Sequence, residues 1–422
     1  MEIVQNNNGK RLKINALLLL SMLVVARVTC SALSNIPIFS VAFTFIYGAA
    51  FIALYLLANR NIKTSDFYLM CSAFVYALYV VFRSFIAGKS LFARDSFNAY
   101  IIIFLTVIYV WIKGQSLETK ALMFKLIFTT LIFDYVYSII VLIQDPNASR
   151  TAASLGVLEK SPYDILSAVG SFDTVYGSLS IIVILVCMRQ LLKKRQLKDF
   201  TSLFVLILSF VFVIMASYAT ALLLLILTVA LLWGQKNKTA SAILLILLLL
   251  LLIFHDPVGE WIMRKSYTIT YSETISEKAY DIGYMLKTFE ASGTYAGDSG
   301  RASKMTASWE TFLRHPIFGG IGLPDCKVYG HSEILDFLGN FGIIGFAFLV
   351  IYMVCLYRSV RKELPSKHFR AGWAIIILVF IISAVLNPSL YSMQMVPLIL
   401  MAPLSFAYVE MCAKKKWLGE HK

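Results

Sequence analysis

One polar segment of this sequence, from about residue 255 to 335, holds the residues whose types and spacing could do chemistry. Arg301 could bind an anion, because a guanidinium group matches phosphate oxygens with two parallel hydrogen bonds; pairing with Asp298 is the alternative. His331 comes shortly before Glu333, and a neutral imidazole that a carboxylate orients can act as a general base near pH 7. A histidine with a purely structural hydrogen bond is the other interpretation. The segment therefore predicts an anion site and a base in one loop.

The polar segment is predicted to be mostly helical. We expect a mildly amphipathic helix at 272–291, a turn-rich linker, and a second helix at 301–314. In the second helix the i, i+4, i+7 spacing predicts a packing face, made of Met305, Trp309 and Phe312, beside a polar face made of Arg301, Lys304 and Ser308. The helix should end at His315, because a proline disfavours the α conformation of the residue before it, and His315 is expected to be structural.

A glycine cluster follows the second helix, at Gly319, Gly320 and Gly322. It could be a plain turn before the membrane, or a nest of backbone amides that binds phosphate. Alone it is a weak signal, since the chain has no Walker A sequence.

The composition indicates what kind of molecule must position this segment. The 422 residues are 59% hydrophobic and only 15% charged, whereas a soluble domain is about 45–50% apolar and about a quarter charged. The apolar runs are continuous and reach the length that spans a bilayer, so we predict an all-α polytopic membrane protein and exclude a β-barrel. The six cysteines are scattered and form no metal signature, and neither a metal nor a cofactor is predicted.

The hydrophobic runs predict twelve spans, at 14–32, 36–57, 66–86, 97–112, 121–143, 165–187, 200–216, 217–233, 239–254, 336–357, 371–387 and 391–411. Most of the 38 Lys and Arg residues then fall in segments on the side of the N-terminus, which places both termini in the cytoplasm by the positive-inside rule. The predicted organisation is nine spans in 1–254, a large extracytoplasmic loop in 255–335, and three spans with a cytoplasmic tail in 336–422. The net charge of +14 is explained by orientation and by anionic lipid, so a nucleic-acid partner is not expected.

Charged residues that fall within predicted spans include Arg27, Arg83, Asp134 and Asp173. Charges in the bilayer are costly and are functional candidates. They could form an internal salt bridge, such as Arg27 with Asp173, or line a polar substrate cavity.

The order of these motifs resembles the O-antigen ligase/polymerase superfamily of bacterial envelope glycosyltransferases. The resemblance is carried by Gly300-Arg301, Trp309, His315-Pro316, the glycine cluster, His331-Ser332-Glu333 and Gly342-Ile343-Ile344-Gly345. It covers about residues 200–411, and the first six spans match only in general architecture.

The resemblance implies an enzyme that takes its glycan from a polyprenyl-diphosphate-linked oligosaccharide, on the outer side of the bacterial cytoplasmic membrane. Arg301 would bind the diphosphate, and His331, with Glu333 beside it, would activate the acceptor hydroxyl. A flippase and chain-length regulator proteins are candidate partners. No nucleotide sugar, cofactor or metal is implied.

The sequence departs from the family at Tyr218, where an arginine is common. A second contact to the diphosphate must then come from another residue, and the candidates are Arg150, Arg264, Arg314 and Lys304. The usual His-Asn is His331-Ser332 here, which is a milder change.

Two enzyme functions share this chemistry and differ in the acceptor. We favour a repeat-unit polymerase of O-antigen, capsule or exopolysaccharide over a ligase that joins the glycan to lipid A-core, because the Glu333 to Asp336 stretch is more similar to polymerases. A lipid-linked oligosaccharide transporter is less favoured, since the sequence shows no internal repeat. A purely structural membrane protein would leave Arg301 and His331 unexplained.

Overall fold

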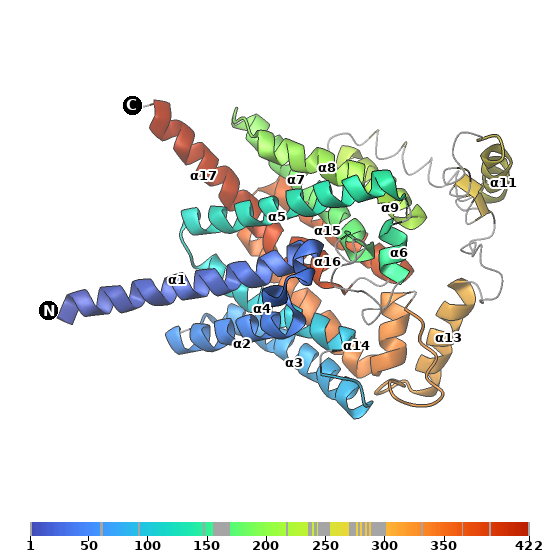
Figure 1. Ribbon diagram of the computed structural model, residues 1–422, viewed down its shortest axis with the longest axis horizontal. Helices are drawn as coiled ribbons and strands as arrows, with labels where there is room; N and C mark the ends of the chain where they lie inside the picture. The colour runs from blue at the N-terminus through green and yellow to red at the C-terminus, as the bar shows by residue number, and fades with distance from the viewer. Residues whose placement is uncertain are drawn as a thin grey trace.

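The computed structural model of the chain is all-helical in the part that it describes (Figure 1). That part comprises residues 2–59, 62–91, 93–146, 148–154, 169–216, 218–234, 254–269, 301–330, 332–364, 366–387 and 390–420, with isolated residues between 239 and 287.

Eight segments among these residues are long and apolar enough to cross a membrane, which makes the chain a helical membrane protein. They are α2 (Val41–Ala58), α3 (Thr64–Ile86), α4 (Arg94–Lys113), α5 (Leu117–Gln144), α7 (Phe172–Lys194), α14 (Glu333–Glu363), α15 (Lys367–Leu386) and the stretch Met393–Lys414. Shorter apolar helices occur in α1 (Glu2–Thr29), α8 (Phe200–Ala216) and α9 (Ala219–Gly234). The predicted split at 216/217 falls between the end of α8 and the start of α9. Most of the span predicted at 239–254 lies outside the described residues. The count of twelve spans therefore stays a prediction.

Serine residues begin several of these helices. The hydroxyl oxygens of Ser40, Ser116, Ser332 and Ser366 each accept a hydrogen bond from a backbone N–H in the first turn of α2, α5, α14 and α15. Such caps satisfy amides that a helix start leaves unpaired. Because the cap sets the first residue, α14 begins three residues before the apolar run that predicted it. Similarly, α7 extends to Lys194, beyond the predicted end at 187.

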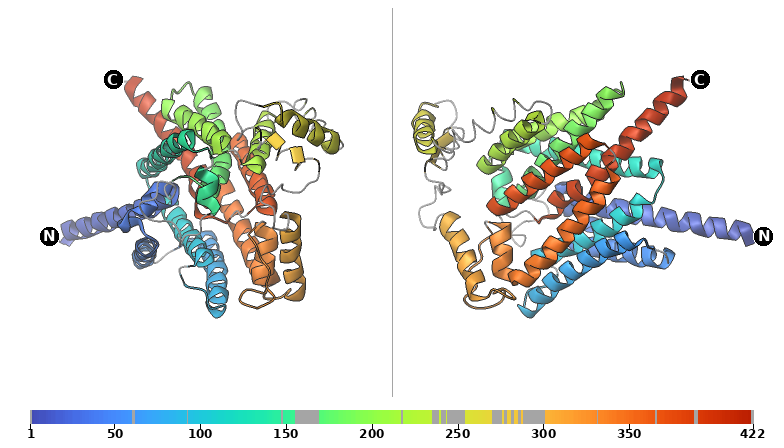
Figure 2. Two further views of the ribbon diagram at one scale, coloured as in Figure 1. Left: turned by 45° about the vertical axis from the view of Figure 1, so that its right-hand side comes forward. Right: turned by 180° about the vertical axis from the view of Figure 1, so that it is seen from behind.

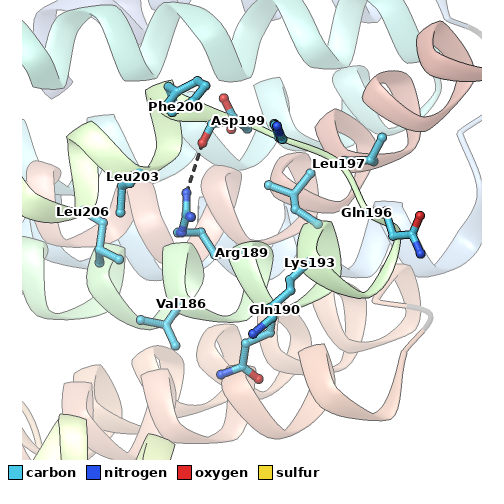
Figure 3. A pocket seen from close by; sticks show the side chains of 12 residues that line it. Val186, Arg189, Gln190, Lys193, Gln196, Leu197, Asp199, Phe200, Leu203 and Leu206 are labelled. Carbon is cyan, nitrogen blue, oxygen red and sulfur yellow. Dashed lines mark hydrogen bonds between the residues drawn. The ribbon is translucent and has the colours of Figure 1, made fainter.

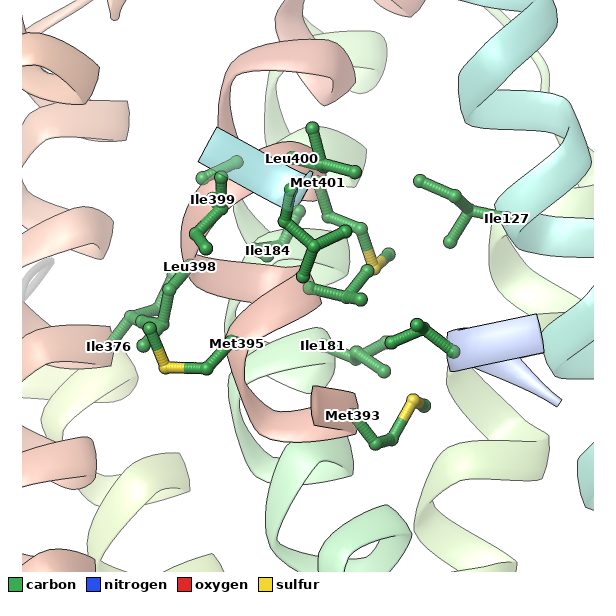
Figure 4. Packing of buried hydrophobic residues seen from close by; sticks show 14 of the residues in the cluster. Ile127, Ile181, Ile184, Ile376, Met393, Met395, Leu398, Ile399, Leu400 and Met401 are labelled. Atoms are coloured by element: carbon green, nitrogen blue, oxygen red, sulfur yellow. The ribbon is translucent and has the colours of Figure 1, made fainter. Parts of the chain in front are cut away.

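The centre of the bundle is formed by α4, α7 and the C-terminal stretch, each with 78% of its apolar window buried, against 22% for α2. Within the C-terminal stretch, one π-helical turn, Pro397–Met401, connects α16 (Ser392–Val396) to α17 (Ala402–Glu420). Proline cannot donate the usual helical hydrogen bond, which explains the wider turn. Figure 4 shows side chains of this turn packed beside those of α7.

The charges predicted within spans are held by backbone groups. The Nε of Arg27 donates to the Phe39 carbonyl at 2.8 Å, and the Oδ1 of Asp134 accepts from the Ser31 amide at 2.7 Å. The Oδ1 of Asp173 accepts from the Thr174 amide at 2.9 Å. The 3-10 turns after α1 supply the carbonyl for Arg27 and the amide for Asp134, whereas Asp173 is bonded at the start of α7. The suggested direct ion pair between Arg27 and Asp173 is not formed, although the carboxylate of Asp173 attracts Arg27 electrostatically.

The two ends of the bundle differ. The N-terminal end of α1 and the C-terminal end of α17 lie at one end, called the terminal end below (Figure 1). Two helices outside the long apolar set, α11 (His255–Ser266) and α13 (Arg301–Arg314), lie at the opposite end, called the loop end, in all three views (Figures 1 and 2). This is the arrangement that the predicted topology requires, although which end faces the cytoplasm stays a prediction.

Helix α14 is broken at Gly342, whose φ is 66° and ψ is −171°. The segment after α13 supplies the hydrogen bonds that the break removes. The Gly320 and Ile321 amides donate to the carbonyls of residues 339 and 340, and the carbonyls of residues 316 and 317 accept from the amides of residues 343 and 344. The Tyr79 hydroxyl donates to the Phe341 carbonyl at 2.9 Å. Since unpaired backbone groups are costly in a membrane, this docking fixes the loop segment against α14.

The positive φ and the close contact at Gly342 predict that Gly342→Ala destabilises the protein. The positive φ with an extended ψ is a region that only glycine adopts readily and costs a residue with a Cβ about 1–3 kcal/mol, and this Cβ would also overlap the Ile317 carbonyl oxygen. Gly88 is the matched control, because its φ is 73° and nothing lies within 4 Å of its Cβ position. In thermal unfolding of the purified protein in detergent, Gly342→Ala should lose more stability than Gly88→Ala. Equal losses would show that the docked segment does not constrain the break.

Candidate functional site

A polar cavity of about 170 Å³ lies at the loop end, beside the first residues of α14. Its walls come from α3, α4, α14 and two connections, and are formed by Tyr76, Val80, Arg94, Asp95, Asn98, Val328, Gly330, Glu333, Asp336, Phe337, Asn340, Phe341, Leu390 and Tyr391. Glu333, a predicted site residue, is therefore part of this cavity. Residue 331 lies outside the described residues, but the cavity is lined by Gly330 before it and Glu333 after it.

The charges around the cavity are mainly acidic. The Oε2 of Glu333 accepts from the Leu390 amide at 3.1 Å. Asp95 is paired with Lys89 at 3.2 Å, at an exposed position. The only arginine among the lining residues, Arg94, stacks its guanidinium over the Tyr391 ring at 4.2 Å from the centroid. Such a site suits the hydroxyl groups of a sugar better than a diphosphate, because a carboxylate accepts hydrogen bonds from hydroxyls and repels phosphate oxygens.

Asp336 joins the cavity to helix α13. Its Oδ1 accepts from the Ser308 hydroxyl at 2.6 Å, and its Oδ2 accepts from the Ser332 amide at 2.9 Å. Ser308 and Ser332 are fully buried, and Asp336 is 8% exposed. One carboxylate thus fixes the helix that begins at Arg301 against the turn that follows residue 331.

The predicted packing face of α13 is partly wrong. Ser308 and Thr311 are buried, Ser308 against Asp336 of α14 and Thr311 against the backbone of Lys327, whereas Trp309 is 41% exposed. The hydrogen bond from Ser308 to the carboxylate of Asp336 turns the serine side of the helix toward α14. The spacing of apolar residues cannot predict such a polar contact. Arg301 lies seven residues before Ser308, so it falls on the same face of the helix by 3.6-residue periodicity.

The other predicted cations are dispersed. Arg314, at the last turn of α13, lies 3.6 Å from Glu310 in an exposed pair. Arg264 pairs with Glu260 within α11, and α11 is apart from α13 in all views (Figures 1 and 2). Lys304 is half-buried in α13, three residues after Arg301. Of these candidates, Lys304 is the one within a single helical turn of residue 301 in α13.

Arg150 belongs to a short helix, α6 (Ala148–Ser154). The Tyr218 hydroxyl donates to the carbonyl of Ser149 at 3.0 Å. Residue 150 is thereby held next to the position where the resemblance expects an arginine. The sequence alone gave no signal for this proximity, because the two residues belong to different helices.

His315 and the glycine cluster have structural roles. The Nε2 of His315 lies 2.9 Å from the Oδ2 of Asp325, and this hydrogen bond lowers the pKa of the Asp325 carboxyl. Gly319 has a φ of 77° and lies directly against the backbone of Asn340, and its carbonyl accepts from the Nη2 of Arg83 at 3.1 Å. The cluster is therefore a turn that docks on the break in α14.

Sequence reasoning did not identify Arg94, Asp95 and Asn98 as site residues. They lie in the first turns of α4, just before an apolar run. Polar residues at the start of a predicted span are the sequence signal that could have identified them. Among the described residues, no group of three or more His, Cys, Asp or Glu side chains is arranged to hold a metal ion.

Comparison with known proteins gives no further guide. No model of a protein family matches the sequence, and no curated protein matches it significantly.

The contacts of Asp336 predict strong coupling between Ser308 and Asp336. A hydrogen bond to a charged group contributes about 1.5–3 kcal/mol, so Ser308→Ala and Asp336→Ala should each destabilise the protein, with a coupling energy of about 1–3 kcal/mol in a double-mutant cycle. Unfolding of the purified protein in SDS measures all four forms. Additive effects would mean that this carboxylate does not hold α13.

Proposed function

We propose that this protein is a polysaccharide repeat-unit polymerase of the bacterial cytoplasmic membrane, with both termini in the cytoplasm. It would transfer glycan from a polyprenyl-diphosphate carrier to a lipid-linked acceptor on the outer side. The observation that supports this proposal best is the hydrogen-bonded link from Ser308 through Asp336 to Ser332. It joins the helix of Arg301 to the residue that follows His331, as a reaction needing both an anion site and a base requires.

The proposed reaction forms one bond and breaks one. The acceptor hydroxyl oxygen attacks the anomeric carbon of the donor glycan, and the bond from that carbon to the diphosphate oxygen breaks. The hydroxyl proton passes to the imidazole of His331, and the polyprenyl diphosphate leaves with the bonding electrons. A cation beside the diphosphate stabilises the charge that develops on it.

The charge distribution supports a division of roles. The cavity with Glu333 would hold the acceptor sugar, because it is small and acidic. Arg301 would bind the diphosphate, and Lys304 is the nearest second cation along the same helix. Arg150, Arg264 and Arg314 remain candidates for that second contact.

A ligase would use the same donor and the same residues, and it differs only in transferring the glycan to lipid A-core. The glycans of a deletion strain distinguish the two functions. Single repeat units on the final carrier, without a ladder, indicate the polymerase, whereas long polymer retained on polyprenyl diphosphate indicates the ligase. A normal ladder in its usual place would contradict both and favour a transporter.

Replacement of either principal residue should abolish the product. In the deletion strain, Arg301→Ala should lose the cation at the leaving diphosphate, and His331→Ala should lose the base, with normal protein levels in the membrane. Lys327→Ala is the control, since Lys327 is an exposed cation of the same loop outside the cavity. A glycan gel gives the result, and a wild-type ladder from either variant would refute its assigned role.

Glu333→Gln removes the negative charge of this side chain and keeps its size and its hydrogen bond to the Leu390 amide. The amide oxygen can still accept from the Leu390 N–H, so stability should be unchanged, whereas loss of the carboxylate should reduce polymer formation about tenfold or more. Glu118→Gln changes an exposed acid in the first turn of α5 and serves as the control. Equal ladders from the two variants would remove Glu333 from the catalytic site.

A further inference from the structure

A second, larger cavity lies where α7 ends and α8 begins, far from the candidate site. Its volume is about 580 Å³. The connection between the two helices is tied to α17, since the Nη2 of Arg195 donates to Glu410 at 2.6 Å and the Tyr408 hydroxyl lies 3.4 Å from Asp199. These contacts place the cavity at the terminal end of the bundle, where apolar helices give way to charged residues.

Three cations line this cavity, against one carboxylate. They are Arg189, Lys193 and Lys198, and the carboxylate is Asp199. The Nη1 of Arg189 donates to the backbone carbonyl of Asp199 at 3.0 Å (Figure 3), which fixes the guanidinium between the two helices without neutralising it. The Oδ1 of Asp199 accepts from the Thr201 amide at 3.2 Å. The cavity is therefore positively charged and has an arginine already held in place.

Apart from Gln190 and Gln196, the rest of the wall is apolar. Val186, Leu203 and Leu206 extend the cavity along α7 and α8, away from the connection between the two helices (Figure 3). Phe200 stands at its rim with 78% of its surface exposed, as aromatic side chains do at the bilayer interface. A cationic end and an apolar wall in one cavity match a molecule with an anionic headgroup and a hydrocarbon chain.

A second cavity lined by cations differs from this one in that one of its three cations is paired with carboxylates. A cavity of about 480 Å³ between α3 and α14 is also lined by cations, Lys113, Arg358 and Lys362. There Lys113 is neutralised by Asp66 at 2.9 Å and Glu363 at 3.3 Å. No such pairing is recorded for Lys193 and Lys198 in the described part of the chain, and both are exposed.

We propose that the cavity between α7 and α8 binds an anionic phospholipid of the adjacent membrane leaflet. Arg189, Lys193 and Lys198 would bind the headgroup phosphate, and an acyl chain would lie along Leu203 and Leu206. The lipid stabilises the tight connection in which Gln196 adopts a left-handed φ of 55°, because it bridges the two helices on either side. This binding does not depend on the proposed glycan chemistry.

The test is lipid binding by the full chain, purified in a mild detergent and titrated with phosphatidylglycerol. Native mass spectrometry and the shift in melting temperature report binding. Lys193→Ala with Lys198→Ala should weaken binding about 25-fold, since each basic residue near an anionic surface contributes about a fivefold factor. Lys194→Ala is the matched control, because Lys194 is an exposed cation of the same helix turn that does not line the cavity.

Two further titrations of the unmodified protein decide the source of the phosphate, even if the double variant does not fold. Phosphatidylcholine should stabilise the protein much less than phosphatidylglycerol, and inorganic phosphate should have no effect because it lacks a chain for the apolar wall. Equal stabilisation by either one would overturn the proposal. So would a Lys194→Ala variant that loses lipid as strongly as the double variant.

Discussion

The arrangement at the loop end depends on one constraint, the need to satisfy backbone groups where α14 breaks at Gly342. A helix in a membrane cannot leave amides and carbonyls without partners. Here the partners come from residues 316–321 and from the Tyr79 hydroxyl. The break therefore requires the segment after α13 to dock, and docking brings α13 beside the first part of α14.

This docking creates two different electrostatic surroundings close together. The cavity beside α14 carries Asp95, Glu333 and Asp336, whereas α13 begins at a cation. Asp336 belongs to both, because it lines the cavity and holds Ser308 of α13. A sugar acceptor with many hydroxyls and a donor with a diphosphate require surroundings of this kind, which is why the geometry suits the proposed transfer. The separate cavity between α7 and α8 is a lipid site in our account and lies outside this chemistry.

Periodicity and end signals predicted much of the helical architecture. The helix at 301–314 has the predicted bounds, and its end is explained by the proline that follows His315. The separation of α8 from α9 followed from span length and charge. The break at Gly342 was not predicted, because an apolar run containing glycine gives the same hydropathy whether the helix is continuous or broken.

The candidate site was predicted less completely than the fold. Glu333 was predicted from its place near a histidine and lines the cavity. The role of Arg301 stays a prediction, and the structure places this residue at the start of α13. Asp95 and Asn98 were missed because they come from a helix more than 200 residues away along the chain. The face of α13 was misjudged for a related reason, since the partner of Ser308 is a carboxylate on another helix.

The central claim is most directly tested by transfer with the purified protein in liposomes, supplied with a polyprenyl-diphosphate-linked repeat unit as both donor and acceptor. The account predicts longer glycans on the carrier and one released polyprenyl diphosphate for each new linkage. It also predicts no product when His331 is replaced by alanine. A folded wild-type protein that left the repeat unit unchanged would contradict the account.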